Sequence, residues 1–161
     1  MSMNSKRKQS LLLVVALLTV AAGASLANTT QIRCDLFHGQ ADAPAANAAP
    51  EKVVRAYLDA VVKNDRETAR TLTSDSYLKH EESVVDSPFC NWKKLSDINI
   101  SPATPTSYDQ GGYKEAVNVT VEFHLQQREE MSMINGPNLW SYTLGRNPPS
   151  ERWEIISGGL G

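Results

Sequence analysis

The segment YKEAVNVTVEFHLQQ, residues 113 to 127, decides the fold class, because apolar and polar side chains alternate along it. Side chains of a β-strand point in turn to the two faces of a sheet, so this period of two predicts a strand with one buried face. The apolar set is Val117, Val119, Val121, Phe123 and Leu125, and the polar set is Asn118, Thr120, Glu122, His124 and Gln126. The strand therefore belongs to a sheet whose apolar face must be covered by other elements.

The same period of two appears in three neighbouring segments. They are LSDINIS (95–101), NLWSYTLG (138–145) and ERWEIIS (151–157). Turn signals rich in Gly, Pro and Asn separate the strands: DQGG (109–112), NGPN (135–138) and NPPS (147–150). Trp140, Tyr142 and Trp153 fall on the apolar faces, where a core position is expected and stacking on a ligand is the alternative.

A helical period precedes the strands. Apolar residues recur along one face of a helix predicted from about residue 50 to 63: Val53, Val54, Tyr57, Leu58, Val61 and Val62. Pro50 suits its first turn. Asn64 or Asp65 then ends this helix and caps a second one, from about 66 to 73, with Ala69 and Leu72 inward, and a short turn with Tyr77 and Leu78 follows. Helices followed by a strand meander predict an α+β fold.

The first 27 residues have the pattern of a signal peptide. A basic cluster at 6–8 precedes an apolar run from Leu11, and SLA at 25–27 resembles a cleavage site. An uncleaved membrane anchor is the alternative, although the 17 residues from 11 to 27 are short for a span. We therefore expect a bacterial protein exported to the periplasm or secreted, with no membrane contact after cleavage.

The charge of the mature chain argues against some partners. The leader removes three basic residues and no acidic ones, which leaves 13 Lys and Arg against 18 Asp and Glu, a net charge of −5. A nucleic-acid binder needs a basic patch, so none is expected. Residues 28–49 form an N-terminal segment and an Ala/Pro-rich linker, and the folded domain is expected at 50–161.

Two cysteines remain in the mature chain, Cys34 and Cys90. In an oxidising compartment an even number favours an intramolecular disulfide; buried free thiols or an intermolecular bridge are the alternatives. The three histidines show no zinc-ligand spacing with each other or with the cysteines, so neither a metal nor another cofactor is predicted.

The layout resembles the nuclear transport factor 2-like superfamily, in which a curved antiparallel sheet wraps an N-terminal helix pair into a cone. The resemblance rests on PEKVVRAYLDAVVKNDRETARTLTSDSY at 50–77 and on the closing RWEIISGGLG at 152–161, which looks like the last strand of many exported bacterial members. It covers residues 50–161. The fold hosts enzymes, binding modules and dimerisation domains alike, so it does not by itself assign a function.

A more distant similarity is to ketosteroid isomerase and polyketide cyclase-like proteins. VVRAY at 53–57 looks like the isomerase helix around its oxyanion-donating tyrosine, which implies that role for Tyr57. Counting on without gaps places Glu81 at the position of the base, although the surrounding SYLKHEES lacks the usual Asp-Pro context. A protonated carboxyl on a strand is the third part of such a site. The nearest candidate, Glu122, is predicted on the polar face.

Three hypotheses follow. The leading one is an exported, non-catalytic domain that binds a small apolar ligand or an envelope protein, with Tyr57, Trp140, Tyr142 and Trp153 as the candidate ligand-binding residues. The second is a proton-transfer enzyme, an isomerase, cyclase or dehydratase, that uses Tyr57 and Glu81. The third is a structural dimerisation domain of an envelope complex, with a homodimer through the polar face of the sheet. The first two hypotheses are separated by whether Tyr57 and a carboxylate share one cavity. The third predicts a filled interior and an apolar patch on the outside of the domain.

Overall fold

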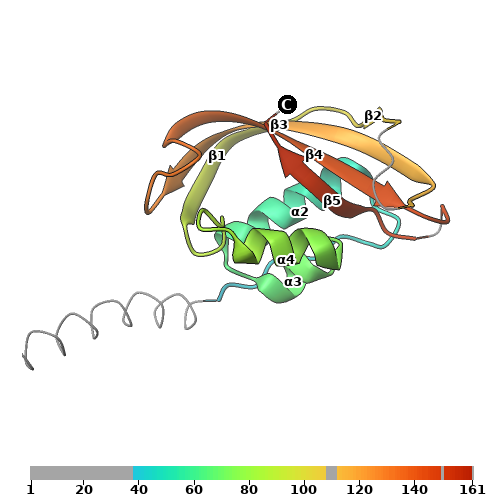
Figure 1. The fold of residues 1–161 in the computed structure, drawn as a ribbon, viewed down its shortest axis with the longest axis horizontal. Helices are drawn as coiled ribbons and strands as arrows, with labels where there is room; N and C mark the ends of the chain where they lie inside the picture. The colour runs from blue at the N-terminus through green and yellow to red at the C-terminus, as the bar shows by residue number, and fades with distance from the viewer. Residues whose placement is uncertain (1–37, 108–111, 150, 161) are drawn as a thin grey trace, which may run out of the picture. The chain divides into compact units, whose positions relative to one another are not determined.

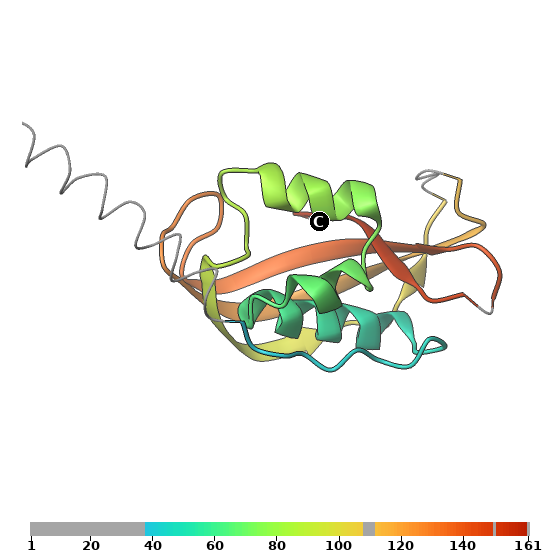
Figure 2. The ribbon, with the colours of Figure 1, turned by 90° about the horizontal axis from the view of Figure 1, so that it is seen from below.

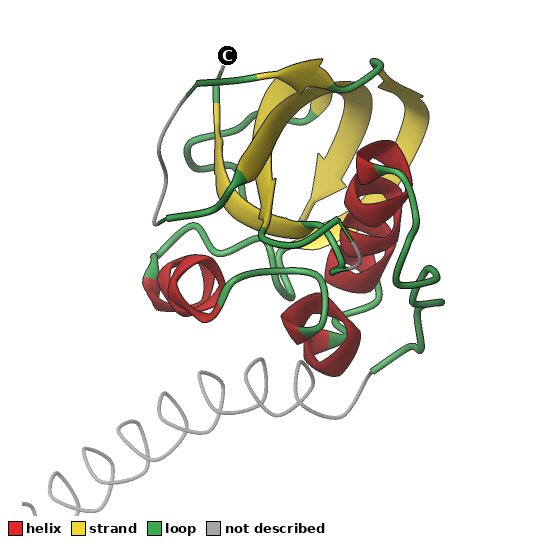
Figure 3. Ribbon diagram, turned by 90° about the vertical axis from the view of Figure 1, so that its right-hand side faces the viewer, coloured by secondary structure: helices red, strands yellow, loops and turns green. Residues whose placement is uncertain are grey.

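The computed structural model describes residues 38–107, 112–149 and 151–160. The predicted signal peptide, Cys34 and most of the predicted 109–112 turn lie outside the described residues. Within these ranges three helices lie on one side of a curved, open antiparallel sheet (Figures 1 and 3), so the α+β prediction is confirmed.

Helix α2, Pro50–Val62, agrees with the predicted first helix to within one residue. Its apolar stripe is buried, and Val53, Tyr57 and Leu58 expose 1% of their surface or less. The helix ends where Asn64 adopts a φ of 54°, a left-handed conformation that Asn tolerates better than most residues. Asp65 then begins the next helix by accepting a hydrogen bond from the Thr68 N–H at 3.0 Å.

The second predicted helix is shorter than expected, α3 (Arg66–Arg70), and the short turn predicted after it is a third helix, α4 (Asp75–Ser83). Between them the backbone pairs with the last strand: Ser74 N donates to Ile155 O and Ile155 N donates to Leu72 O, each at 2.9 Å. These bonds require an extended chain at residues 72–74, which ends α3. Tyr77 and Leu78, predicted in a turn, are buried residues of α4.

The sheet contains five strands, and its order is β1-β3-β4-β5, with β2 also paired to β3. The strands are β1 (Trp92–Ile100), β2 (Thr104–Pro105), β3 (Glu115–Gln127), β4 (Gly136–Arg146) and β5 (Glu154–Gly159). All pairings between them are antiparallel. Strand β1 is irregular between Ser96 and Asn99, where Asp97 has a φ of 52°.

Strand β3 shows the predicted alternation. Val119, Val121, Phe123 and Leu125 are buried against the helices, whereas Glu122, His124 and Gln126 are exposed on the opposite face. That exposed face carries hydroxyl and amide pairs, among them Thr120 with Ser141 at 3.1 Å. The predicted homodimer through this face stays a prediction.

The chain before α2 is attached to the helices, although its composition predicted a linker. Ala41 is buried, and its N–H donates to the Asp65 carboxylate at 2.8 Å. Gly39 N donates to Lys63 O at 2.8 Å. Asp65 thus fixes both the start of α3 and this segment, which runs along the helices in Figure 2.

Candidate functional site

A cavity of about 160 Å³ lies between the helices and the sheet. Its walls come from α2, α4, the segment between α4 and β1, the first residue of β1, the last residue of β3 with the loop that follows it, and strands β4 and β5. Five aromatic residues contribute to the wall: Tyr57, Tyr77, Trp92, Trp140 and Tyr142. The cavity therefore collects residues that are far apart in sequence.

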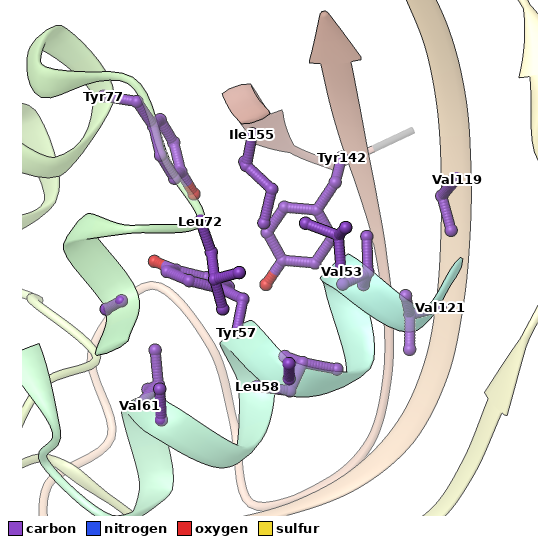
Figure 4. Close-up of a cluster of buried hydrophobic side chains, with 14 of the residues drawn as sticks. Val53, Tyr57, Leu58, Val61, Leu72, Tyr77, Val119, Val121, Tyr142 and Ile155 are labelled. Atoms are coloured by element: carbon purple, nitrogen blue, oxygen red, sulfur yellow. The ribbon is translucent and has the colours of Figure 1, made fainter. Parts of the chain in front are cut away.

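Three tyrosines form the centre of this wall. The Tyr57 ring lies 5.8 Å from the Tyr142 ring in an edge-to-face arrangement and 6.2 Å from the Tyr77 ring, measured between centroids. Figure 4 shows them converging from α2, β4 and α4 beside Leu72 and Ile155. Such aromatic pairs stabilise a core by about 0.5–1.5 kcal/mol beyond their buried area. Tyr57 is therefore both a core residue and a cavity residue.

The hydroxyl of Tyr57 is buried and has no hydrogen-bond partner among the described residues. Burial raises the pKa of Tyr57 well above its ordinary value, and the nearby Tyr142 and Glu81 raise it further. The phenol thus stays protonated at neutral pH and is available as a donor. A buried polar group without a partner costs about 1–3 kcal/mol, so this hydroxyl calls for an explanation.

The pair formed by Tyr57 and Tyr77 gives two different indications. Tyr77 lowers the pKa of Tyr57, as a hydrogen-bonding neighbour would. Yet no hydrogen bond of acceptable length and angle joins the Tyr57 hydroxyl to any described group. Because a hydrogen bond requires both a short distance and a suitable angle, we treat Tyr77 as a close neighbour of Tyr57 and not as its partner.

Glu81, on α4, lines the same cavity as Tyr57. Burial raises the pKa of its carboxyl, and Asp86 adds to the rise, whereas His80 and Tyr77 oppose it. The Glu81 carboxylate in turn raises the pKa of Tyr57, Tyr77 and Tyr142. A carboxylate and three phenols therefore interact across one small space.

Gly158, on β5, allows two polar atoms to approach the wall. A Cβ atom at this position would lie 2.7 Å from the Tyr77 hydroxyl oxygen and 3.0 Å from Trp140 Nε1. Real Cβ atoms essentially never come as close as the first of these distances. Any side chain at Gly158 would displace the tyrosine or the indole, so the glycine keeps this part of the cavity open.

The structure brings together four of the predicted site residues, Tyr57, Glu81, Trp140 and Tyr142. Trp153 lies elsewhere: it is buried, and the guanidinium carbon of Arg146 lies 4.3 Å from its ring centroid. The other carboxyl group considered, Glu122, is on the exposed face and accepts a hydrogen bond from Asn99 at 3.3 Å. Glu122 therefore cannot serve as the protonated carboxyl group that an isomerase-type site requires in addition to the tyrosine and the base.

Sequence reasoning missed Tyr77, Asp86 and Gly158 as cavity residues. The sequence predicts Tyr77 in a short turn after the second helix and Gly158 in the closing strand. No local signal marks Tyr77 or Asp86, because they contribute to the cavity only after α4 and the segment that follows it pack against α2 and the sheet. The glycine-rich end of the last strand, next to an aromatic face, was the one available indication.

Another hollow in the described part of the chain is a weaker candidate. It has a volume of about 450 Å³, lies between α2 and β1 and is bordered by charged side chains such as Lys52 and Arg55. Arg55 donates to Ile98 O at 3.2 Å, and no residue of this hollow carries a buried polar atom without a partner. Within the described residues, no group of His, Cys, Asp or Glu side chains could hold a metal ion.

None of the helices in the described ranges is long and apolar enough to cross a membrane. Comparison of the sequence with models of protein families found no match, and comparison with curated proteins found none either.

Proposed function

We propose that the domain binds a small ligand, about the size of a single ring, in the tyrosine-lined cavity, and that the ligand presents an oxygen acceptor to Tyr57. The observation that carries the proposal is the Tyr57 hydroxyl, which is buried without a partner in the wall of a cavity. Binding sites are characteristically apolar hollows with a few polar groups in fixed positions. A structural domain, by contrast, is expected to have a filled interior.

The size of the cavity limits the ligand. An engineered apolar cavity of about 150 Å³ binds benzene, and the volume here is about 160 Å³. One six-membered ring with a small substituent fits such a space, whereas a fused polycyclic compound requires the walls to move apart. The aromatic walls provide apolar contacts to the ligand, and a hydrogen bond from Tyr57 orients it.

The test is a titration with cyclohexanone and benzyl alcohol, followed by NMR chemical-shift changes. The Tyr57→Phe variant should bind either probe about 2- to 12-fold more weakly, as expected for one neutral hydrogen bond of about 0.5–1.5 kcal/mol. Tyr113→Phe is a matched control, because the Tyr113 hydroxyl donates to Glu154 at 2.9 Å and Tyr113 does not line the cavity. Unchanged affinity in Tyr57→Phe, or no binding of either ring at millimolar concentration, would contradict the proposal.

A proton-transfer enzyme is the second candidate, and one observation favours it: Tyr57 and Glu81 line the same cavity. In such a reaction the Glu81 carboxylate takes a proton from the carbon next to a ketone carbonyl. The C–H electron pair forms the enolate, whose oxygen accepts a hydrogen bond from Tyr57, and protonated Glu81 returns the proton to carbon. Raising a carboxyl pKa toward neutrality makes it a better general base.

The enzyme candidate is tested by hydrogen–deuterium exchange of cyclohexanone in D₂O, followed by NMR. It requires exchange above the background rate, lost in Glu81→Gln and reduced about 10²- to 10³-fold in Tyr57→Phe, the range for one oxyanion donor. Binding of cyclohexanone without accelerated exchange would leave the binding function and exclude this reaction.

A further inference from the structure

The charged groups around the cavity are of one sign. Glu81 and Asp86 line it, and no Lys or Arg is among the described residues that do so. Of the described residues that line the cavity, only His80 can carry a positive charge, and it is exposed. An anionic ligand would thus meet two carboxylates and no permanent cation, whereas a cationic ligand would be attracted.

Apart from the exposed His80, which lowers its pKa, Glu81 has no cationic neighbour among the described residues that form ion pairs. Its neighbour Glu82 lies 3.9 Å from Arg66, but no described basic side chain lies within ion-pair distance of Glu81. Carboxylates that are partly removed from water are normally paired, because burial penalises the charged form. Because Glu81 lines the cavity, a positively charged group bound there could pair with its carboxylate.

Two further features of the same cavity suit a cation attached to a ring. The Tyr57 hydroxyl, on a side chain that is 1% exposed, marks the interior, whereas Glu81 and Asp86 are only partly buried and mark the solvent side. Trp92 and Trp140 also line the cavity, and aromatic faces attract cations electrostatically. The interior of the cavity is thus apolar with one hydrogen-bond donor, the Tyr57 hydroxyl, and its solvent side is acidic.

We propose that the ligand carries a positively charged nitrogen, which Glu81 and Asp86 bind at the solvent side of the cavity while the ring occupies the tyrosine-lined interior. This inference rests on the proposed binding function and specifies the chemical class of its ligand as a small aromatic or cyclic amine that also carries the oxygen acceptor for Tyr57. Benzylamine lacks that acceptor, so the probes below test the cationic group alone. It gives Glu81 a binding role that requires no catalysis.

The experiment compares three probes that share one ring: benzylamine, which is protonated at neutral pH, benzyl alcohol and benzoate. Dissociation constants are measured by NMR titration of the full mature chain. Benzylammonium should bind about tenfold or more tightly than benzyl alcohol, as expected for one charge-assisted contact. Benzoate should bind most weakly. Raising the salt concentration should weaken binding of benzylammonium and leave benzyl alcohol nearly unchanged.

Variants locate the effect. Glu81→Gln should reduce the preference for benzylammonium over benzyl alcohol to about twofold or less, and Asp86→Asn should reduce it in part. Glu82→Gln is the matched control, because Glu82 is the adjacent carboxylate, does not line the cavity and faces Arg66. It should leave the preference unchanged.

The outcomes separate this inference from the function on which it rests. If benzyl alcohol binds as tightly as benzylammonium, the cationic class is wrong and the binding function stands. If none of the three probes binds, the binding function is wrong and the inference falls with it. A salt-insensitive preference for the amine that survives in both Glu81→Gln and Asp86→Asn would also overturn the inference.

Discussion

Replacing Tyr57 by Phe should stabilise the free domain, although it removes a polar group that we assign to ligand binding. The ring would keep its contacts with Tyr77 and Tyr142 in the same geometry. Only the hydroxyl would be lost, and this hydroxyl is buried without a partner. The substitution therefore removes a desolvated group and breaks no hydrogen bond.

The magnitude follows from the cost of leaving a donor unsatisfied, about 1–3 kcal/mol. Relief of about 1 kcal/mol should raise the melting temperature by about 3–5 °C in a domain of this size. Tyr57→Ala should instead destabilise by about 3–5 kcal/mol, because it removes a large aromatic side chain from the core. The two variants at one position should thus change stability in opposite directions.

Chemical denaturation without added ligand measures both effects. Tyr113→Phe serves again as control: it removes a hydroxyl that donates to Glu154 at 2.9 Å, so it should destabilise by up to about 1 kcal/mol. Tyr57→Phe and Tyr113→Phe should therefore differ in sign. A loss of 1 kcal/mol or more in Tyr57→Phe would mean that its hydroxyl is hydrogen-bonded in the free protein, and the binding proposal would lose its main support.

Three further predictions concern other parts of the domain. Glu81→Gln should raise the melting temperature at pH 7. Burial raises the pKa of Glu81 in the folded state, so the ionised carboxylate destabilises the fold increasingly as the pH rises from the ordinary pKa of 4.5 through the folded-state pKa. If Glu81→Gln raised the melting temperature equally at pH 4 and at pH 7, this reasoning would be wrong. Gly158→Ala should lower the free energy of unfolding by about 1–3 kcal/mol through overpacking, because the new Cβ would lie 2.7 Å from the Tyr77 hydroxyl oxygen. It should also weaken the binding of benzyl alcohol. Unchanged stability and affinity would mean that the cavity wall can move to accept the methyl group. Non-reducing peptide mapping should link Cys34 to Cys90, with about 4 kcal/mol of stability in the chain-entropy model, and alkylation of both thiols in the native protein would exclude the bridge.

The elements that the sequence predicts well are those with a strong local period. The apolar stripe of α2 fixes its face and its end to within one residue, because neither depends on the rest of the chain. The alternation of β3 fixes which side chains are buried, from Val119 to Leu125. In both cases the pattern itself is the physical cause of burial.

The elements that it predicts poorly depend on distant partners. The break between α3 and α4 occurs because residues 72–74 bond to Ile155, a pairing without a local signal. The Ala/Pro-rich segment lacks an apolar period, yet Ala41 is held by Asp65, 24 positions later. The cavity is the extreme case, since its walls come from segments spread between residues 57 and 158. Glu81 was found through a family resemblance, and Tyr77 and Asp86 were not found as cavity residues.

The pairing of Ile155 with the turn between α3 and α4 has a consequence for the order of folding. The chain emerges from the ribosome at about 5–20 residues per second, starting from its N-terminus. The helices and strands β1 to β4 are therefore synthesised before the strand that attaches α3 and α4 to the sheet. Until residue 155 is available, Leu72 O and Ser74 N lack their backbone partners. The helical layer should close only when the nascent chain is nearly complete, so truncation before β5 should leave α4 undocked and the cavity unformed.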